Sequence, residues 1–132
     1  MRTNMTSHVD GDTIRYAEDN KEFFSIKEKY LIGDKSASME LNGELRSDLR
    51  DEFADEMLMF LLNGMDLTID MASVTYISKT CQMEIVSANR KKKESGARGK
   101  LTIINVPQDI YSEFEKIHLT KTVRIFKQGG KG

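Results

Sequence analysis

Apolar positions recur with two alternating periods along most of this chain. Ser36–Leu41 alternates polar and apolar residues, which is typical of a strand with one buried face. The next segment instead has apolar residues at i, i+4, i+8, i+11 and i+12, which predicts a helix with an apolar stripe. The stripe consists of Leu49, Phe53, Met57, Phe60 and Leu61. Leu67–Asp70 returns to alternation, so a strand is expected after this helix.

The pattern continues to the C-terminus. Upstream, Phe23–Ile32 indicates one or two strands. Downstream, a second helix is predicted to end near Ser95, a strand covers Leu101–Ile104, and Pro107 lies in the first turn of a third helix. A last short element is expected near Ile125. The alternation predicts an α/β fold, a mixed and partly parallel β-sheet of about four to five strands with helices packed against it.

The chain of 132 residues has the length of one domain. Residues 1–20 are polar without either period, so we expect a flexible N-terminal arm, in which Thr13–Tyr16 is the one candidate for a short edge strand. Residues 21–127 form the expected domain. Residues 128–132 are expected to be a disordered tail.

Composition excludes several classes of function. The 20 basic and 21 acidic residues nearly balance, which gives no electrostatic reason to expect nucleic acid as a partner. One Cys excludes an internal disulfide, and with two His it offers no metal-site spacing. No apolar run approaches the roughly 20 residues that cross a bilayer, and the polar N-terminus lacks a signal-peptide core. We therefore expect a cytoplasmic protein without metal, cofactor or membrane partner.

The segment from Ser78 to Thr80 opens the second predicted helix and carries the candidate chemistry. Ser78 or Thr80 can cap the helix, because a hydroxyl there accepts a hydrogen bond from a free backbone N–H. A helix N-terminus also tolerates a phosphate. Cys81 follows and is either a small buried residue or a reactive thiol with a lowered pKa. His118 is predicted to take a left-handed position that ends the third helix.

In their order and spacing, several short segments resemble the STAS domain, the family of sulfate transporter and anti-sigma-factor antagonist domains. The resemblance runs from about Phe24 to Phe126 and implies the STAS fold. The segments are Leu41–Leu45, Leu67–Asp70, Val74–Ile77, Leu101–Val106 and His118–Leu119, where the family usually has Gly-Leu.

This resemblance implies a protein-interaction domain that performs no catalysis. The implied partner is an anti-sigma factor that is also a serine kinase, or another STAS-containing protein. In such pathways the unphosphorylated domain binds the anti-sigma factor and thereby frees a sigma factor. The kinase phosphorylates a Ser or Thr at the start of the second helix, and a phosphatase reverses this. The phosphate adds about −1.5 to −2 charges, and like-charge repulsion then disfavours the complex.

The sequence departs from the family pattern at the switch itself. The family motif is Asp-Ser-Ser/Thr-Gly-Leu-Gly, and the segment Ser78–Met83 stands in its place. Lys79 occupies the usual acceptor position, so Thr80 and Ser78 are the remaining phospho-acceptor candidates. Three interpretations stay open: one of these hydroxyls is the acceptor, the switch is absent, or Lys79 presents a fixed charge to a different partner. The residues expected to dock a partner are Ser78, Lys79, Thr80, Gln82 and Met83.

Other classes of function have weaker support. Asp70 at a strand end is compatible with a receiver domain, but the chain lacks the acidic pair and the Lys that receivers need. No Ser–His–Asp, zinc, P-loop or dinucleotide signature suggests an enzyme. The alternative to sigma-factor control is a STAS scaffold or a nucleotide-sensing module, for which the only support is the candidate anion site at Lys79–Thr80.

Overall fold

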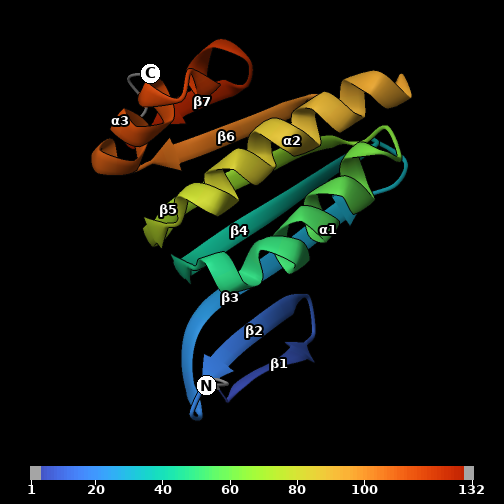
Figure 1. The fold of residues 1–132 in the computed structure, drawn as a ribbon. Coiled ribbons are helices and arrows are strands. Elements are labelled where there is room, and N and C mark those ends of the chain that lie inside the picture. Colours follow the sequence, from blue (N-terminus) through green and yellow to red (C-terminus); the bar gives the residue numbers. More distant parts are fainter. Residues whose placement is uncertain (1–3, 130–132) are drawn as a thin grey trace.

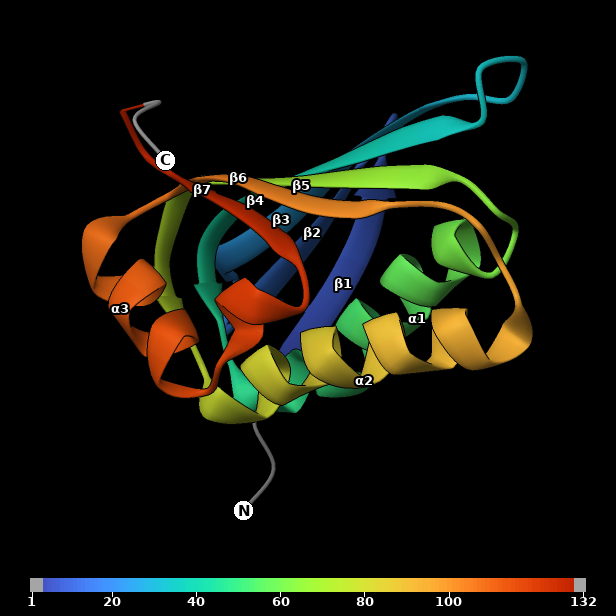
Figure 2. The ribbon, with the colours of Figure 1, turned by 90° about the horizontal axis from the view of Figure 1, so that it is seen from above.

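The computed structural model describes residues 4–129, which form one seven-stranded sheet with three α-helices on one of its faces (Figures 1 and 2). Each helix connects two neighbouring strands. The strands are β1 (Met5–Asp10), β2 (Thr13–Glu18), β3 (Lys21–Leu31), β4 (Ser36–Leu45), β5 (Asp66–Ile77), β6 (Leu101–Val106) and β7 (Arg124–Lys127). The helices are α1 (Arg50–Leu61), α2 (Lys79–Ser95) and α3 (Gln108–Lys116), with short 3-10 turns η1 (Ser47–Leu49) and η2 (Leu119–Lys121).

Strand order in the sheet follows the order in the sequence. The strands from β1 to β4 pair antiparallel through hairpins, and those from β4 to β7 pair parallel. Each parallel connection contains one helix and advances by one strand in the same direction, so successive helices lie on the same face of the sheet (Figure 2). The carboxyl ends of β4 and β5 consequently meet at one end of the molecule, where α1 and α2 begin.

The hydrophobic core lies between the sheet and the helices. The stripe predicted on α1 is buried, with Phe53, Met57 and Leu61 all fully covered. They pack with the inward residues of the central strands, such as Met39 and Ile69, in one continuous cluster. The opposite face of the sheet carries mainly polar side chains, which explains the alternation seen in the sequence.

The expected fold class is confirmed, and the candidate strand Thr13–Tyr16 lies in β2, but the N-terminal half contains more strands than expected. The stretch expected as a flexible arm forms the hairpin β1–β2, and this hairpin brings the sheet to seven strands where about four to five were expected. Tyr16 and Ile14 pair with Phe24 and Ile26 of β3, which extends the core to β2. The sequence signal was weak because β1 is an edge strand whose side chains are nearly all exposed. Of the regions expected to be unstructured, residues 1–3 and 130–132 lie outside the described residues.

Most of the predicted helix boundaries are found. The second helix ends at Ser95, and His118 has a φ of 62°, the left-handed position predicted for it. The first helix is preceded by the 3-10 turn η1, which begins at Ser47. The α-helix itself begins at Arg50.

An acidic group is enclosed between β3 and α1. One carboxylate oxygen of Glu28, Oε2, is buried and has no hydrogen-bond partner among residues 4–129. The pKa of Glu28 is raised to about 8, first because burial disfavours the charged form and second because Glu56 of α1 lies beside it. Burial, with Glu52 and Glu56 nearby, also raises the pKa of Tyr16 to about 12. Neutral Glu28 therefore fits this site better than the carboxylate does.

We expect the protein to lose stability as the pH rises from about 4.5 to about 8. In this range the folded state binds a proton at Glu28 that the unfolded state has released, so folding is favoured at the acidic end. Glu28→Gln should reduce this dependence and stabilise the protein at alkaline pH, as measured by urea unfolding at several pH values. Glu40→Gln, at an exposed position of β4, is the control. An unchanged pH dependence in Glu28→Gln would contradict this assignment.

Candidate functional site

The start of α2 is fixed to the ends of β4 and β5 by backbone geometry. Ile77 is the last residue of β5, and α2 begins at Lys79. The N–H of Ser78, between them, donates a hydrogen bond of 2.9 Å to the carbonyl oxygen of Leu45, the last residue of β4. This hydrogen bond joins the tip of α2 to the end of β4. We define the helix tip as residues 78–83.

Ser78 is the N-cap residue of α2. Its backbone is extended (φ −66°, ψ 153°), and its Oγ accepts a hydrogen bond of 3.1 Å from the N–H of Cys81. Only 2% of the residue is exposed. Its hydroxyl therefore stabilises the first turn of the helix and faces away from solvent.

Cys81 is completely buried beneath the helix tip. Its Sγ donates a hydrogen bond of 3.4 Å to the carbonyl oxygen of Arg46, which follows β4. Burial raises the pKa of the Cys81 thiol, although the Ser78 hydrogen bond opposes the shift. Of the two roles considered for this Cys, the structure favours the small buried residue over the reactive thiol.

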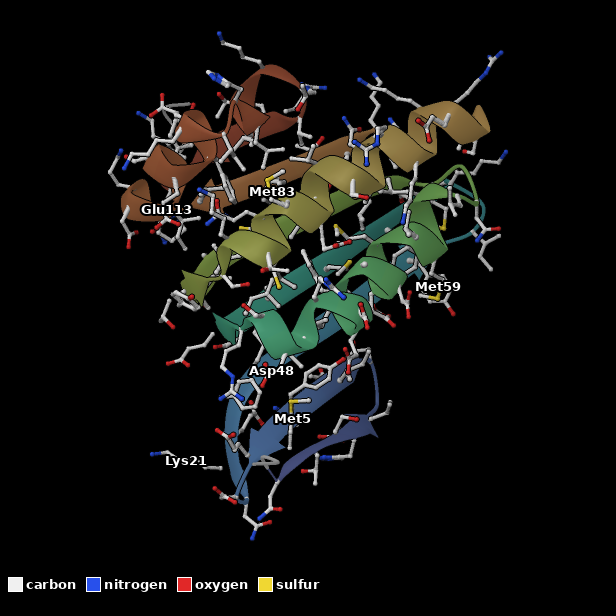
Figure 3. All side chains as sticks on the ribbon, in the orientation of Figure 1. Met5, Lys21, Asp48, Met59, Met83 and Glu113 are labelled. Atoms are coloured by element: carbon white, nitrogen blue, oxygen red, sulfur yellow. The ribbon has the colours of Figure 1, made fainter. Side chains whose placement is uncertain are left out.

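Gln82 connects the helix tip to α3. It is 3% exposed, and its Nε2 donates hydrogen bonds of 3.2 Å to the carbonyl oxygen of Ile77 and 2.6 Å to Oε1 of Glu113. Figure 3 labels Glu113 on α3, next to the start of α2. Sequence reasoning did not identify Glu113. The available signal was a polar Gln at a position that the STAS pattern fills with Leu, because a buried amide needs a polar partner.

The remaining residues of the helix tip face solvent. Lys79 and Thr80 are exposed, and Met83 is 45% exposed although it is apolar. Tyr76, near the end of β5, is 52% exposed and was not singled out from the sequence. Of the five residues expected to dock a partner, three are accessible and two, Ser78 and Gln82, are buried supports. The helix tip thus combines a cation, a hydroxyl and an apolar side chain on a rigid base.

Asp70 and Lys92, two charged residues outside the helix tip, make structural contacts. Asp70 Oδ1 accepts hydrogen bonds from the N–H of Ala72 and from Nδ2 of Asn105, at 2.9 and 3.2 Å. Lys92, near the end of α2, donates to the carbonyl oxygen of Gly99 at 2.7 Å. Among residues 4–129, no group of three or more His, Cys, Asp or Glu residues could hold a metal ion, and no helix is long and apolar enough to cross a membrane.

This chain has a mixed sheet with its helices on one face, and the capped start of α2 lies beside the ends of the central parallel strands. This is the STAS fold of anti-sigma factor antagonists. Solved structures share this fold with the chain. A Thermotoga maritima protein assigned to the anti-sigma factor antagonists has 17% identity and a TM-score of 0.65, with 77% of this chain and 86% of that one covered.

Two further structures extend the comparison. An anti-sigma factor antagonist from Mycobacterium paratuberculosis has 12% identity and a TM-score of 0.65, covering 78% of this chain and 85% of its own. The phosphorylated form of SpoIIAA, a Bacillus cell fate determinant, has 10% identity and a TM-score of 0.57, covering 76% and 89%. No protein-family model and no curated protein sequence matches the chain. The likeness is therefore one of fold.

We expect Ser78→Ala to destabilise the protein by about 1 kcal/mol, the usual effect of losing an N-cap hydrogen bond. Thr80→Ala is the matched control, because this hydroxyl is exposed and its loss should change the free energy of unfolding by less than about 0.5 kcal/mol. Urea unfolding measures both. Equal effects of the two substitutions would contradict the different roles assigned to the two hydroxyls.

Proposed function

We propose that this chain is a non-enzymatic docking domain of a bacterial partner-switching pathway. It binds an anti-sigma factor that is also a serine kinase, in the cytoplasm, and so releases a sigma factor. The fold shared with anti-sigma factor antagonists supports the class of function. The observation that carries the proposal is the helix tip, where Lys79, Thr80 and Met83 are exposed above a buried base.

The rigidity of the helix tip favours docking. Ser78, Cys81 and Gln82 are each hydrogen-bonded to a neighbouring element or within the first turn of α2. A surface that is ordered before binding loses little conformational entropy when a partner arrives. Met83 supplies an apolar contact, and Lys79 supplies a charge that selects an acidic partner surface.

We further propose that the phosphorylation switch is altered. Thr80 is the better acceptor of the two candidates because its hydroxyl is accessible, whereas that of Ser78 is buried and already bonded. A phosphate on Thr80 would lie beside Lys79 and at the positive end of the α2 dipole. Lys79, which replaces the family's usual acceptor hydroxyl, would neutralise part of its charge of about −1.5 to −2, so phosphorylation would repel a partner less strongly than in a typical antagonist.

The docking proposal is tested at Met83. Met83→Glu should weaken binding to the cognate anti-sigma factor by about 2 kcal/mol, because it places a charge in the apolar part of the contact. Val9→Glu is the matched control, since Val9 is 70% exposed on the edge strand β1, away from the helix tip. Calorimetric titration with the kinase recovered by pull-down measures both. The proposal fails if the two variants bind equally well, or if pull-down returns neither a serine kinase nor a STAS-containing protein.

The switch proposal is tested at Lys79 and Thr80. Incubation with the cognate kinase should phosphorylate Lys79→Ser at position 79, since this change restores the usual acceptor. Any phosphate on the unmodified chain should be at Thr80 and should disappear in Thr80→Ala. Mass spectrometry identifies the modified residue. Phosphate on Ser78 would contradict the assignment, as would failure of Lys79→Ser to accept phosphate from a kinase that binds it.

A further inference from the structure

A second exposed apolar surface lies at the end of the molecule opposite the helix tip. The hairpin between β3 and β4 extends beyond the sheet at the end where α1 and α2 finish (Figure 2). A cavity of about 440 Å³ lies between this hairpin and the end of α1. We call it the hairpin groove. Its apolar lining consists of Tyr30, Ile32, Met59, Phe60 and Met65.

The apolar side chains around the hairpin groove are unusually exposed. Ile32 is 76% exposed, Tyr30 57% and Met59 46%, and Leu62 is 47% exposed one helical turn after Met59. Figure 3 shows Met59 at the end of α1 that is far from Asp48. Clustered apolar side chains of this exposure are uncommon on monomeric proteins and often mark an interaction site.

The groove has a fixed shape. The rings of Tyr30 and Phe60 are 5.9 Å apart and form its floor. At the hairpin turn, the N–H of Lys35 donates to the carbonyl oxygen of Ile32, and the carbonyl oxygen of Lys35 accepts from the N–H of Asp66 at 2.8 Å. Lys35 adopts a φ of 51°, a left-handed conformation that costs free energy for a residue with a side chain. A Gly would adopt this conformation more easily, but the chain has Lys35 here, which places a charged side chain next to the groove.

Charges of both signs surround the groove. Lys35 is the one charged residue in its lining. Asp34 precedes it in the turn, and Asp55 lies on α1 one turn before Met59. None of the three forms an ion pair among residues 4–129. All three are exposed and thus available to another molecule.

We propose that the hairpin groove binds a second copy of this chain in a two-fold symmetric dimer. In such a dimer each surface meets itself, so it must contain both a projection and a recess. Ile32 is the projection and the groove beside it is the recess. The charges satisfy the same condition, because Lys35 of one copy can face Asp34 and Asp55 of the other. An anionic membrane would instead be repelled by the two carboxylates.

The dimer would leave the helix tips free. The groove and the helix tip lie at opposite ends of the molecule, so a dimer joined at the grooves presents both tips outward. It could therefore engage two partner molecules at once, which raises the effective affinity for a partner that is itself dimeric. Dimer formation does not depend on the proposed partner, so its test stands apart from that of the function.

The first test is the oligomeric state of the full chain. Sedimentation velocity over a range of micromolar concentrations should show a monomer–dimer equilibrium. Ile32→Glu should raise the dimer dissociation constant about tenfold or more, because it places a charge in the recess of the partner copy. Val9→Glu, at an apolar position that is 70% exposed on the edge strand β1, should leave it unchanged. A monomer at all concentrations would overturn the proposal, as would an Ile32→Glu protein that is folded by circular dichroism and dimerises normally.

The second test uses charge exchange. Lys35→Glu alone should dissociate the dimer, and so should the double variant Asp34→Lys with Asp55→Lys, because each places like charges across the two-fold axis. Mixing the two proteins should restore a dimer, since every facing pair is then of opposite charge. Native mass spectrometry distinguishes the mixed dimer by mass. If either variant dimerises alone as well as the unmodified chain, or if the mixture stays monomeric, the proposed pairing is wrong.

Discussion

The structure depends on how the first turn of α2 is held to the ends of two parallel strands. The N–H of Ser78 bonds to Leu45 at the end of β4, and its hydroxyl caps the helix that follows β5. Gln82 then connects the same turn to Glu113 of α3. Ser78 and Gln82 are buried, where an unpaired polar group is costly, so their hydrogen bonds fix the direction in which α2 leaves the sheet. Three elements are thereby joined at one point, and the accessible residues of the helix tip sit directly above it.

The same topology separates the two proposed interaction surfaces, because they lie at opposite ends of the molecule. Because each parallel crossover returns in the same direction, α1 and α2 both begin at one end of the sheet and finish at the other (Figure 2). The end of the molecule at which these helices begin carries the helix tip, with its cation and its hydroxyl. The opposite end of the molecule carries the hairpin groove, which has exposed apolar side chains in its lining. A partner at one end need not displace anything at the other, so docking and self-association are compatible in one small domain.

The sequence predicted those parts of the fold whose signal is periodic. The alternation of β4 and the stripe of α1 arise from burial on one face, and both are found. Of the hairpin β1–β2, the candidate strand Thr13–Tyr16 lies in β2, but β1 was missed because this edge strand buries almost nothing and so has no apolar pattern. At the candidate site, the position of the helix tip followed from the order of elements. The accessibility of each hydroxyl could not be predicted in this way, because Ser78 is held against Leu45, which is far away in the sequence. Glu113 was missed for the same reason.

The central claim is that the helix tip is the surface that meets the partner. Hydrogen exchange of the chain alone and in complex with its cognate anti-sigma factor tests this most directly, because it reports protection along the whole backbone. We expect added protection over residues 76–84, at the end of β5 and the start of α2, with the hairpin at residues 30–36 unchanged by the partner. Protection at another surface, with no change at residues 76–84, would contradict the account.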